Sequence, residues 1–387
     1  MRILFTTTPG SGHFNPMIPL ARAMTARGHQ VTFASSPAWT PEVEAAGFRN
    51  IGCGPTWRET MTDPVMQEIL RKDFFVELGR MGMVEDVVRA ARSIDADLIA
   101  YEGAEVGGLL ASAILGIPCV QASAAAGKMW WQIMQPKLAT LAAEQGLDSE
   151  RVASMDFPLV YVDRTPPTLE TPGFVPYRNL YNARPEIYEH PSEMPSWADK
   201  LGNRPIVYVT LGTVFSNPQL FKLLAGAFAG EPVDVVLATG GAFPLEALGE
   251  LPPNVHAGGY LPQSKLVARA EVVVAHGGYN TVISAMTYGV PMYVIPIEAD
   301  QPYNASRLVA AGAAISAPVQ EVPPGTPRQF TPPEPAAIRD AVRRLLGESS
   351  FKEAAGRVRA EIAAMPPVSS AVEHIEMAQR GAAATMA

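Results

Sequence analysis

Residues 271–281 read EVVVAHGGYNT: an apolar β-branched run followed by a histidine, two glycines and small polar residues. The run predicts a buried strand, and the following TVISAMTYG is typical of a helix. Glycines let the backbone approach an anion closely, and the first amides of a helix point toward it. The stretch therefore predicts a strand–turn–helix unit whose turn holds a phosphate, with an ordinary glycine turn and helix cap as the alternative.

The same alternation of apolar runs and helical segments extends along the chain. Strands are predicted at 2–8, 30–36, 96–102 and 117–123, and again at 205–211, 233–240, 254–260, 271–277 and 291–297. Short apolar strands alternating with helices are typical of parallel sheets covered on both faces. The sequence therefore predicts an α/β protein of two doubly wound, Rossmann-like domains that face each other across a cleft.

Composition shifts place the domain boundaries. Residues 182–204 are rich in proline and polar residues, so we expect them to link a domain at 1–181 to a domain at 205–365. A last helix is expected within 366–387, after Pro366 and Pro367. Its return to the N-terminal domain is left open.

Bulk properties exclude several classes of function. The 387 residues are 48% hydrophobic, which is enough for a core in each domain, and the net charge of −8 without a basic run argues against nucleic-acid binding. No apolar stretch reaches the length of a membrane span, and the N-terminus does not resemble a signal peptide. Cys53 and Cys119 stand alone, so we expect a cytoplasmic protein with reduced thiols. The sequence leaves the oligomeric state open, between a monomer and a homodimer.

Other polar residues follow the strands of the second half. Gly212, Thr213 and Ser216 can serve phosphate oxygens in the same way as His276, Asn280 and Thr281. An aromatic Tyr260 can stack on a base, and Gln263 can bond to the edge of that base. Asp300 and Gln301 suit the hydroxyl groups of a sugar. The alternatives are a core tyrosine and a simple helix cap. The candidate residues for a nucleotide sugar are thus Gly212, Thr213, Ser216, Tyr260, Pro262, Gln263, His276, Gly277, Gly278, Asn280, Thr281, Asp300 and Gln301.

In this order the residues resemble the donor-binding signature of GT-B glycosyltransferases of the family-1 kind. That signature runs aromatic-x-Pro-Gln, His-Gly-Gly-x-x-Thr, Gly-x-Pro and Asp-Gln, and Gly289 and Pro291 supply its third part here. The chain is most similar to actinobacterial enzymes that decorate macrolides, aromatic polyketides and enediynes. The resemblance implies that 205–365 bind a nucleotide sugar as co-substrate, that 1–181 bind the acceptor, and that no cofactor is needed.

Two positions depart from the family pattern. Tyr260 stands where many relatives have tryptophan, and Ser284 stands where relatives that use UDP-sugars commonly have glutamate. A glutamate there accepts hydrogen bonds from both ribose hydroxyls, whereas a deoxyribose lacks one of them. Ser284 therefore favours a dTDP-sugar over a UDP-sugar, and dTDP in turn suggests a deoxyhexose.

The N-terminal half offers a catalytic base. His13 follows the first strand in a turn with Gly10 and Gly12, and a histidine there can act as a general base near neutral pH. The resemblance places the base at the histidine of Gly-His-x-Asn-Pro, which is His13 here. Relatives orient this histidine with an aspartate, and Glu102 stands at that place, with Glu105 as the alternative partner. Because glutamate is one methylene longer, we expect a local backbone adjustment.

Aromatic and methionine residues suggest where the acceptor binds. They can form a pliable apolar pocket, or they can be ordinary core. The substrate-binding candidates are Gly12, Trp57, Met61, Phe74, Phe75, Met129, Trp130 and Met134. The Asp-Ala-Asp at 95–97 opens a strand instead of ending one, so we expect no metal site.

The sequence thus predicts an inverting glycosyltransferase that moves a hexose from a dTDP-sugar to a hydroxyl of an apolar natural product, with His13 as base. Three alternatives stay open: a catalytically silent relative that activates a partner enzyme, a nucleotide-sugar epimerase of the same fold, and an NAD-dependent dehydrogenase. The last is disfavoured because Gly10 and Gly12 lack the third glycine of the dinucleotide fingerprint.

Overall fold

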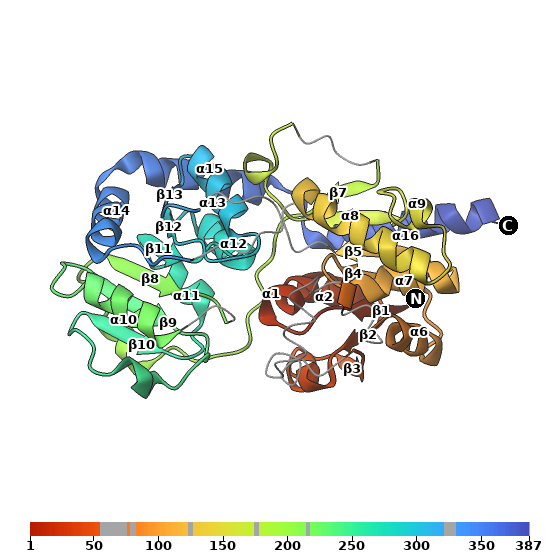
Figure 1. The fold of residues 1–387 in the computed structure, drawn as a ribbon, viewed down its shortest axis with the longest axis horizontal. Coiled ribbons are helices and arrows are strands. Elements are labelled where there is room, and N and C mark those ends of the chain that lie inside the picture. Colours follow the sequence, from red (N-terminus) through yellow and green to blue (C-terminus); the bar gives the residue numbers. More distant parts are fainter. Residues whose placement is uncertain are drawn as a thin grey trace. The chain divides into compact units, whose positions relative to one another are not determined.

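The chain forms two compact units, seen in a computed structural model (Figure 1). The structure describes residues 1–387 except 55–75, 78–82, 123–126, 174–177, 214–216, 321–329 and 387, and for 127–133 and 382–386 it describes the backbone alone. Unit 1 comprises Met1–Thr165, Thr171–Tyr188 and Met365–Ala387. Unit 2 comprises Pro166–Glu170 and Glu189–Ala364.

Unit 1 is built on a parallel sheet. Its described strands lie in the order β3-β2-β1-β4-β5-β6-β7, and every neighbouring pair is parallel. The strands are β1 (Arg2–Thr6), β2 (Gln30–Ser35), β3 (Arg49–Gly52), β4 (Leu98–Glu102), β5 (Cys119–Ala122), β6 (Val160–Asp163) and β7 (Leu180–Asn182). The sequence predicted β1, β2, β4 and β5 but not the other three.

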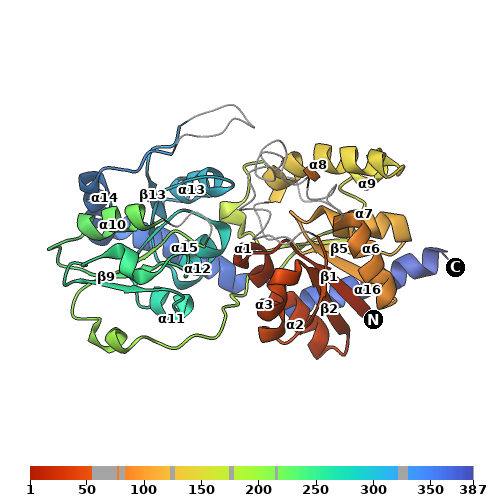
Figure 2. The same cartoon turned by 60° about the horizontal axis from the view of Figure 1, so that its bottom comes forward.

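Two layers of helix cover this sheet, one on each face (Figure 2). Successive strand residues point to opposite faces, so Leu4 packs under one layer while Ile3 and Phe5 pack under the other. The first layer contains α6 (Val84–Ser93), α7 (Val106–Leu115), α8 (Gly127–Glu144) and α9 (Ser149–Val152). The second contains α1 (Ser11–Phe14), η1 (Asn15–Met17), α2 (Ile18–Ala26), η2 (Pro37–Trp39), α3 (Thr40–Ala45) and α16 (Val368–Met386).

Unit 2 repeats this design. Its described strands lie in the order β10-β9-β8-β11-β12-β13, again all parallel. They are β8 (Ile206–Thr210), β9 (Asp234–Ala238), β10 (Val255–Gly258), β11 (Val272–Ala275), β12 (Met292–Val294) and β13 (Ala314–Ser316). The predicted class, an α/β protein with two parallel-sheet domains, is confirmed.

Helices also cover both faces of the second sheet. Core residues on one face come from α10 (Pro218–Ala227) and α14 (Pro335–Gly347). The other face is covered by α11 (Gln263–Val267), α12 (Tyr279–Tyr288), α13 (Gln301–Ala310) and α15 (Ser349–Ala364). Unit 2 also contains the short 3₁₀ helices η5 (Ser196–Lys200) and η6 (Leu245–Leu248).

The strand order reverses at one point in each sheet. In unit 1 the chain moves outward in one direction from β1 and in the other from β4, and in unit 2 the same holds for β8 and β11. In open α/β sheets, ligands bind beyond the carboxyl ends of the strands at such a switch point. The segments that follow β1, β4, β8 and β11 are therefore the places where a functional site is expected.

A short segment departs from the order expected from the sequence. Pro166–Glu170, with the 3₁₀ helix η4 (Pro167–Leu169), belongs to unit 2 although it lies between β6 and β7. Leu169 is buried in the unit 2 core, and the backbone amide of Thr168 donates to both carboxylate oxygens of Glu361, at 3.1 and 3.2 Å. The expected linker, 182–204, also divides, because the structure assigns its residues up to Tyr188 to unit 1 and those from Glu189 to unit 2.

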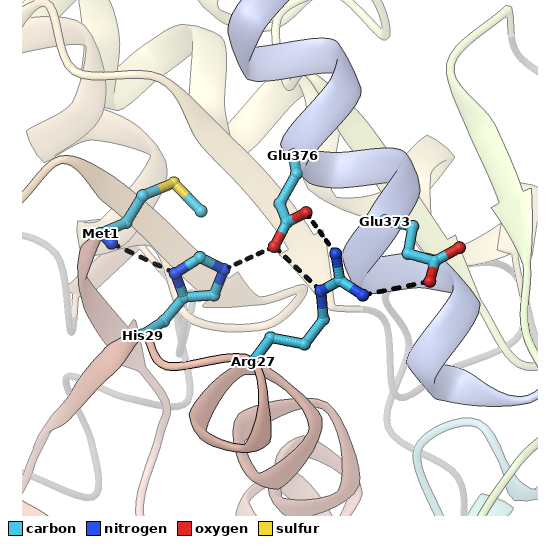
Figure 3. Close-up of polar contacts among 5 residues, drawn as sticks. All are labelled: Met1, Arg27, His29, Glu373 and Glu376. Atoms are coloured by element: carbon cyan, nitrogen blue, oxygen red, sulfur yellow. Dashed lines mark hydrogen bonds and ion pairs between the residues drawn. The ribbon is translucent and has the colours of Figure 1, made fainter.

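The last helix, α16, packs in unit 1 (Figure 3). Arg27 Nη1 lies 3.1 Å from Glu373 Oε1, and Arg27 Nη2 lies 2.8 Å from Glu376 Oε2. His29 Nε2 lies 2.9 Å from Glu376 Oε1. The hydrogen bond with Arg27 lowers the pKa of Glu376 to about 2. Beneath these ion pairs, Val368, Ala371 and other apolar residues of α16 join the core against α2.

Within the part of the chain that the structure describes, no helix is both long enough and apolar enough to span a membrane.

Candidate active site

The turn after β1 presents His13. Gly10 has a φ of 140°, which favours glycine, and its carbonyl oxygen accepts from the amides of His13 and Phe14 at 3.1 and 2.9 Å. These bonds start α1 and place His13 in its single turn. Arg164, which directly follows β6 and is buried, donates to the carbonyl oxygen of Pro16 at 2.5 Å. This bond stabilises η1, the 3₁₀ helix that follows α1.

Glu102 is the carboxylate beside His13. It is the last residue of β4, which pairs with β1 at the switch point, and its Oε2 lies 3.1 Å from His13 Nδ1. The Glu102 side chain is 2% exposed, whereas 42% of the His13 side chain is exposed. Because Nδ1 is buried toward the carboxylate, the exposed part of the imidazole lies on its other edge. The structure thus brings this histidine and this carboxylate to within 3.1 Å of each other, at ion-pair distance.

Glu105 has a different position. Its carboxylate accepts from the amides of Gly107 and Gly108 and caps the N-terminus of α7. Burial raises its pKa to about 7, against the lowering effect of bonds from Thr6 and the two amides. A Cβ on Gly108 would lie 2.3 Å from Thr6 Oγ1, so glycine is needed where the helix meets the strand. Between the two candidates, the structure places Glu102, and not Glu105, against His13.

In unit 2, the turn after β11 leads directly into α12. Gly277 has a φ of 91°, and Gly278 is the N-cap residue of the ten-residue helix that follows. The carbonyl oxygen of Gly278 accepts from the amides of Thr281 and Val282, at 3.0 and 3.1 Å. Glycine has no side chain, so Gly278 cannot cap the first amides of α12. The positive end of the helix dipole lies at the same place, at the end of the turn. Asn280 and Thr281 lie in this first turn, as the sequence predicted.

His276 is buried beside the glycines. Its burial lowers its pKa to about 4, with the Thr210 backbone opposing the shift, so the imidazole is neutral near pH 7. A Cβ on Gly278 would lie 2.5 Å from His276 Nε2, and a Cβ on Gly212 would lie 2.9 Å from the same atom. The two glycines therefore make room for this ring. Gly212 also has a φ of 75°.

The strand β8 carries the neighbouring candidates. It pairs with β11 at the switch point of the second sheet, so Gly212 and Thr213 follow it beside the His276 turn. The exposed Thr213 lies at the end of the described part of this loop. Ser216 lies outside the described residues.

Tyr260 lies at the end of β10 with its side chain exposed. It is 43% exposed, and its hydroxyl accepts from the His190 amide at 3.3 Å. The His190 ring meets the tyrosine ring edge-on, with centroids 6.3 Å apart. Pro262 is the N-cap residue of α11 and Gln263 is its first residue. Tyr260 therefore presents a partly exposed aromatic ring two residues before the N-cap of α11.

Asp300 and Gln301 stand at the start of α13. The Gln301 side-chain oxygen accepts from the amides of Ile297 and Glu298, at 2.7 and 3.0 Å. Ala299 has a φ of 56°, which a residue with a Cβ rarely adopts. Gln301 thus fixes a strained loop that presents Asp300, and this use of its oxygen was not predicted.

Ser284 lies on α12 with no exposed surface. Its hydroxyl has no hydrogen-bond partner among the described residues.

The acceptor candidates fall mostly outside the described structure. This applies to the residues Trp57, Met61, Phe74 and Phe75, and to the side chains of Met129 and Trp130. Met134 is 1% exposed and packs in the unit 1 core, as the alternative interpretation of these residues expects. Gly12 is exposed in α1. The pocket proposed from the sequence stays a prediction.

The Asp-Ala-Asp segment at 95–97 makes contacts with the first strand. Asp97 bonds to the backbone and side chain of Arg2, which accounts for the Asp-Ala-Asp segment, and the described residues contain no cluster of three potential metal ligands. That no metal takes part stays a prediction.

Asn304 was not predicted from the sequence, although its side-chain amide donates to both Gly277 and Asp300. Its place four residues after Asp300, on the same helix face, was the available signal.

Comparisons with known proteins cover both units. Residues 231–377 match a family model described as "Erythromycin biosynthesis protein CIII-like, C-terminal domain". The L-demethylnoviosyl transferase of Streptomyces niveus is 30% identical over 82% of this chain and 85% of its own length. The 4'-demethylrebeccamycin synthase of Lentzea aerocolonigenes is 27% identical over 97% and 99%. The solved structure of the Streptomyces sp. SF2575 glycosyltransferase SsfS6, complexed with thymidine diphosphate, has a TM-score of 0.77 and 27% identity over 97% and 99%.

Proposed function

The chain belongs to the GT-B glycosyltransferases that act on natural products, and on that premise we propose that it transfers a hexose from a dTDP-sugar to a hydroxyl of an apolar aglycone, with inversion. The resemblance drawn from the sequence is thereby confirmed, and so is the assignment as a glycosyltransferase. The donor nucleotide, the base and the stereochemistry are the parts that we propose.

The observation that carries the proposal is the contact between His13 and Glu102. An acceptor hydroxyl must lose its proton as it attacks, and a neutral imidazole can take that proton. Glu102, 3.1 Å from Nδ1, favours the tautomer with a proton on that atom and stabilises the imidazolium that forms. In this scheme the acceptor oxygen forms a bond to the anomeric carbon, the bond to the diphosphate breaks, and the proton goes to His13.

The turn at 276–281 would hold the diphosphate. Negative charge grows on the leaving diphosphate, and donors that meet it where it forms lower the barrier. The N-terminus of α12 would supply amides and a favourable dipole, and Thr213 would supply a hydroxyl from the loop that follows the neighbouring strand β8. His276 would contribute as a neutral donor, since its pKa is about 4.

Asp300 is the proposed contact to the sugar. A carboxylate accepts from two neighbouring hydroxyl groups, and the loop fixed by Gln301 holds it in place. Because the Gln301 oxygen is already used by two amides, its NH₂ group is the part that would meet the hexose. Tyr260 would stack on the base, with Pro262 and Gln263 beside it.

Two observations favour a dTDP donor. Ser284 has a single short, neutral hydroxyl, so it holds the two ribose hydroxyls of UDP less strongly than the carboxylate of a glutamate would. SsfS6 was solved with thymidine diphosphate, which supports the same nucleotide here. The acceptor proposal, an apolar aglycone, is supported by the relatives, one of which is named for rebeccamycin. We propose no cofactor beyond the nucleotide sugar.

Titration calorimetry with dTDP and with UDP tests the donor site. We expect tighter binding of dTDP by the purified protein and a loss of binding in His276→Ala. Tighter binding of UDP would overturn the argument from Ser284 and keep the sugar transferase. Binding of neither nucleotide would overturn the proposed donor site.

Turnover tests the base. We expect His13→Ala to bind dTDP as the unaltered protein does, because His13 belongs to the other unit, and to lose transfer activity by about 10² to 10⁴. Inversion is checked by the anomeric configuration of the product. Full activity in His13→Ala would contradict the assignment of this residue.

A further inference from the structure

From the contacts of Asn304 we infer that this residue positions the donor site, by fixing the diphosphate turn and the sugar carboxylate with one amide group. Its Nδ2 donates to the carbonyl oxygen of Gly277 at 2.9 Å and to Asp300 Oδ2 at 2.8 Å. The residue is 6% exposed, so both bonds form away from water. The inference rests on the proposed donor site, since Gly277 and Asp300 belong to it.

The bond to Gly277 controls the direction of a neighbouring amide. A trans peptide unit is planar, so the N–H of Gly278 points away from the carbonyl of Gly277. Gly277 has a φ of 91° and no side chain, and its backbone has many accessible conformations in isolation. By holding this carbonyl, Asn304 fixes where the Gly278 N–H points, at the start of the proposed diphosphate cradle.

The bond to Asp300 controls the carboxylate. The Asn304 backbone amide also donates to the Asp300 carbonyl oxygen at 3.0 Å, so the two residues are joined twice, one helical turn apart. The Asp300 carboxylate and the Gly277 carbonyl are both acceptors, and a donor placed between them offsets their repulsion. The NH₂ group of asparagine carries two protons on one nitrogen, so it can donate to both acceptors at once. A serine or threonine hydroxyl carries one proton, and an aspartate carboxylate carries none.

The consequence is that the two ends of the donor site are set by one side chain. A change at Asn304 should affect nucleotide binding through Gly277 and sugar transfer through Asp300. Asn304 itself touches neither proposed group of the donor, so it is a positioning residue and not a catalytic one.

The test compares Asn304→Ala and Asn304→Asp with a control on the same helix. Asn304→Asp keeps the shape of the side chain and removes the donor, so it remains informative if the alanine variant does not fold. Ser306→Ala is the control, because Ser306 is exposed and bonds only to the Tyr303 carbonyl at 2.7 Å among the described contacts. Folding of each variant is followed by thermal unfolding.

Two readouts separate positioning from a general loss of stability. Calorimetry with dTDP should show affinity about tenfold or more weaker in both Asn304 variants, which is the loss expected for a buried bond, and unchanged in Ser306→Ala. Turnover of dTDP-glucose should fall in Asn304→Ala and in Asp300→Ala. In the double variant the loss should be smaller than the product of the two single losses, because the residues act together.

Each outcome decides the inference. Asn304 variants that bind dTDP as the unaltered protein does would overturn it, and so would losses that multiply independently of Asp300. Where dTDP-glucose is not turned over by the unaltered protein, the dTDP affinities alone decide. If the unaltered protein binds neither dTDP nor UDP, it is the proposed donor site that fails, and the inference falls with it.

Discussion

Glu102 Oε2 lies 3.1 Å from His13 Nδ1, and the carboxylate is buried while the imidazole is partly exposed. The contact joins α1, which follows β1, to the last residue of β4, and these two strands are neighbours at the point where the strand order reverses. A glutamate thus reaches the histidine at a place where relatives were expected to have the shorter aspartate.

Glu102→Gln tests this contact directly. Glutamine has the same shape but no charge, so it cannot stabilise the imidazolium, and we expect kcat to fall by about 10². Steady-state kinetics over pH would show the loss in kcat, with dTDP affinity unchanged because the proposed donor residues lie in unit 2. Glu102→Asp is the matched control for charge and should recover part of the activity. An unchanged kcat in Glu102→Gln would contradict the role of this residue.

His276 predicts a pH dependence of stability. Its pKa is lowered from 6.5 to about 4 in the folded protein, so the folded state disfavours protonation. The stability that it contributes is present above pH 6.5 and is lost as the pH falls toward 4, by at most about 3 kcal/mol. Denaturant unfolding at several pH values should show this loss in the unaltered protein and a smaller one in His276→Gln. An equal loss of unfolding free energy in both proteins would contradict the attribution of this pH dependence to His276.

Substitutions at Tyr260 should distinguish the contribution of its ring to dTDP binding from that of its hydroxyl. Tyr260→Phe keeps the exposed aromatic face and loses only the bond from the His190 amide at 3.3 Å, so dTDP affinity should change little. Tyr260→Ala removes the face and should weaken dTDP binding by about 1–3 kcal/mol, the usual contribution of a stacked base. Calorimetry measures both. Equally large losses in the two variants would show that the hydroxyl is important and not stacking, and unchanged affinity in both would contradict any role of Tyr260 in dTDP binding.

Ser284→Ala predicts an unusual stability effect. The buried hydroxyl of Ser284 has no hydrogen-bond partner among the described residues, so its removal loses no bond and should leave the free energy of unfolding unchanged or raised by up to about 1 kcal/mol. Ser112→Ala is the control, since buried Ser112 donates to the Ile117 carbonyl and its removal should destabilise by about 1 kcal/mol. Chemical denaturation distinguishes them. A clear destabilisation by Ser284→Ala would reveal a partner for this hydroxyl.

Much of the fold could be predicted because its central strands are apolar runs. Strands such as β1, β4, β8 and β11 are buried on both faces, and their β-branched residues identify them in the sequence. The edge strand β7 has three residues, all partly exposed or exposed, and such a short segment has no clear periodicity. The packing of Leu169 in unit 2 could not be predicted, because it depends on contacts with helices more than a hundred residues away.

The candidate site was predictable to the extent that its residues follow strands. His13, Glu102 and His276 each stand at or just after the carboxyl end of a predicted strand, and the switch points bring the strands together. Asn304 escaped detection because its role depends on the Gly277 carbonyl, 27 residues earlier in the chain. Backbone acceptors carry no signal in the sequence, so bonds to them are found only in three dimensions.

The return of α16 to unit 1 has a consequence for engineering. Residues 189–364 are preceded and followed along the chain by residues of unit 1, so most of unit 2 is an insertion between two parts of unit 1. A chimaera that exchanges everything after the expected linker would also replace Arg27's partners Glu373 and Glu376, and would leave a foreign helix on the recipient's sheet. A chimaera should therefore exchange residues 189–364 as an internal segment and keep the recipient's own α16. Its η4 should come from the same protein as that segment, because η4 packs in unit 2.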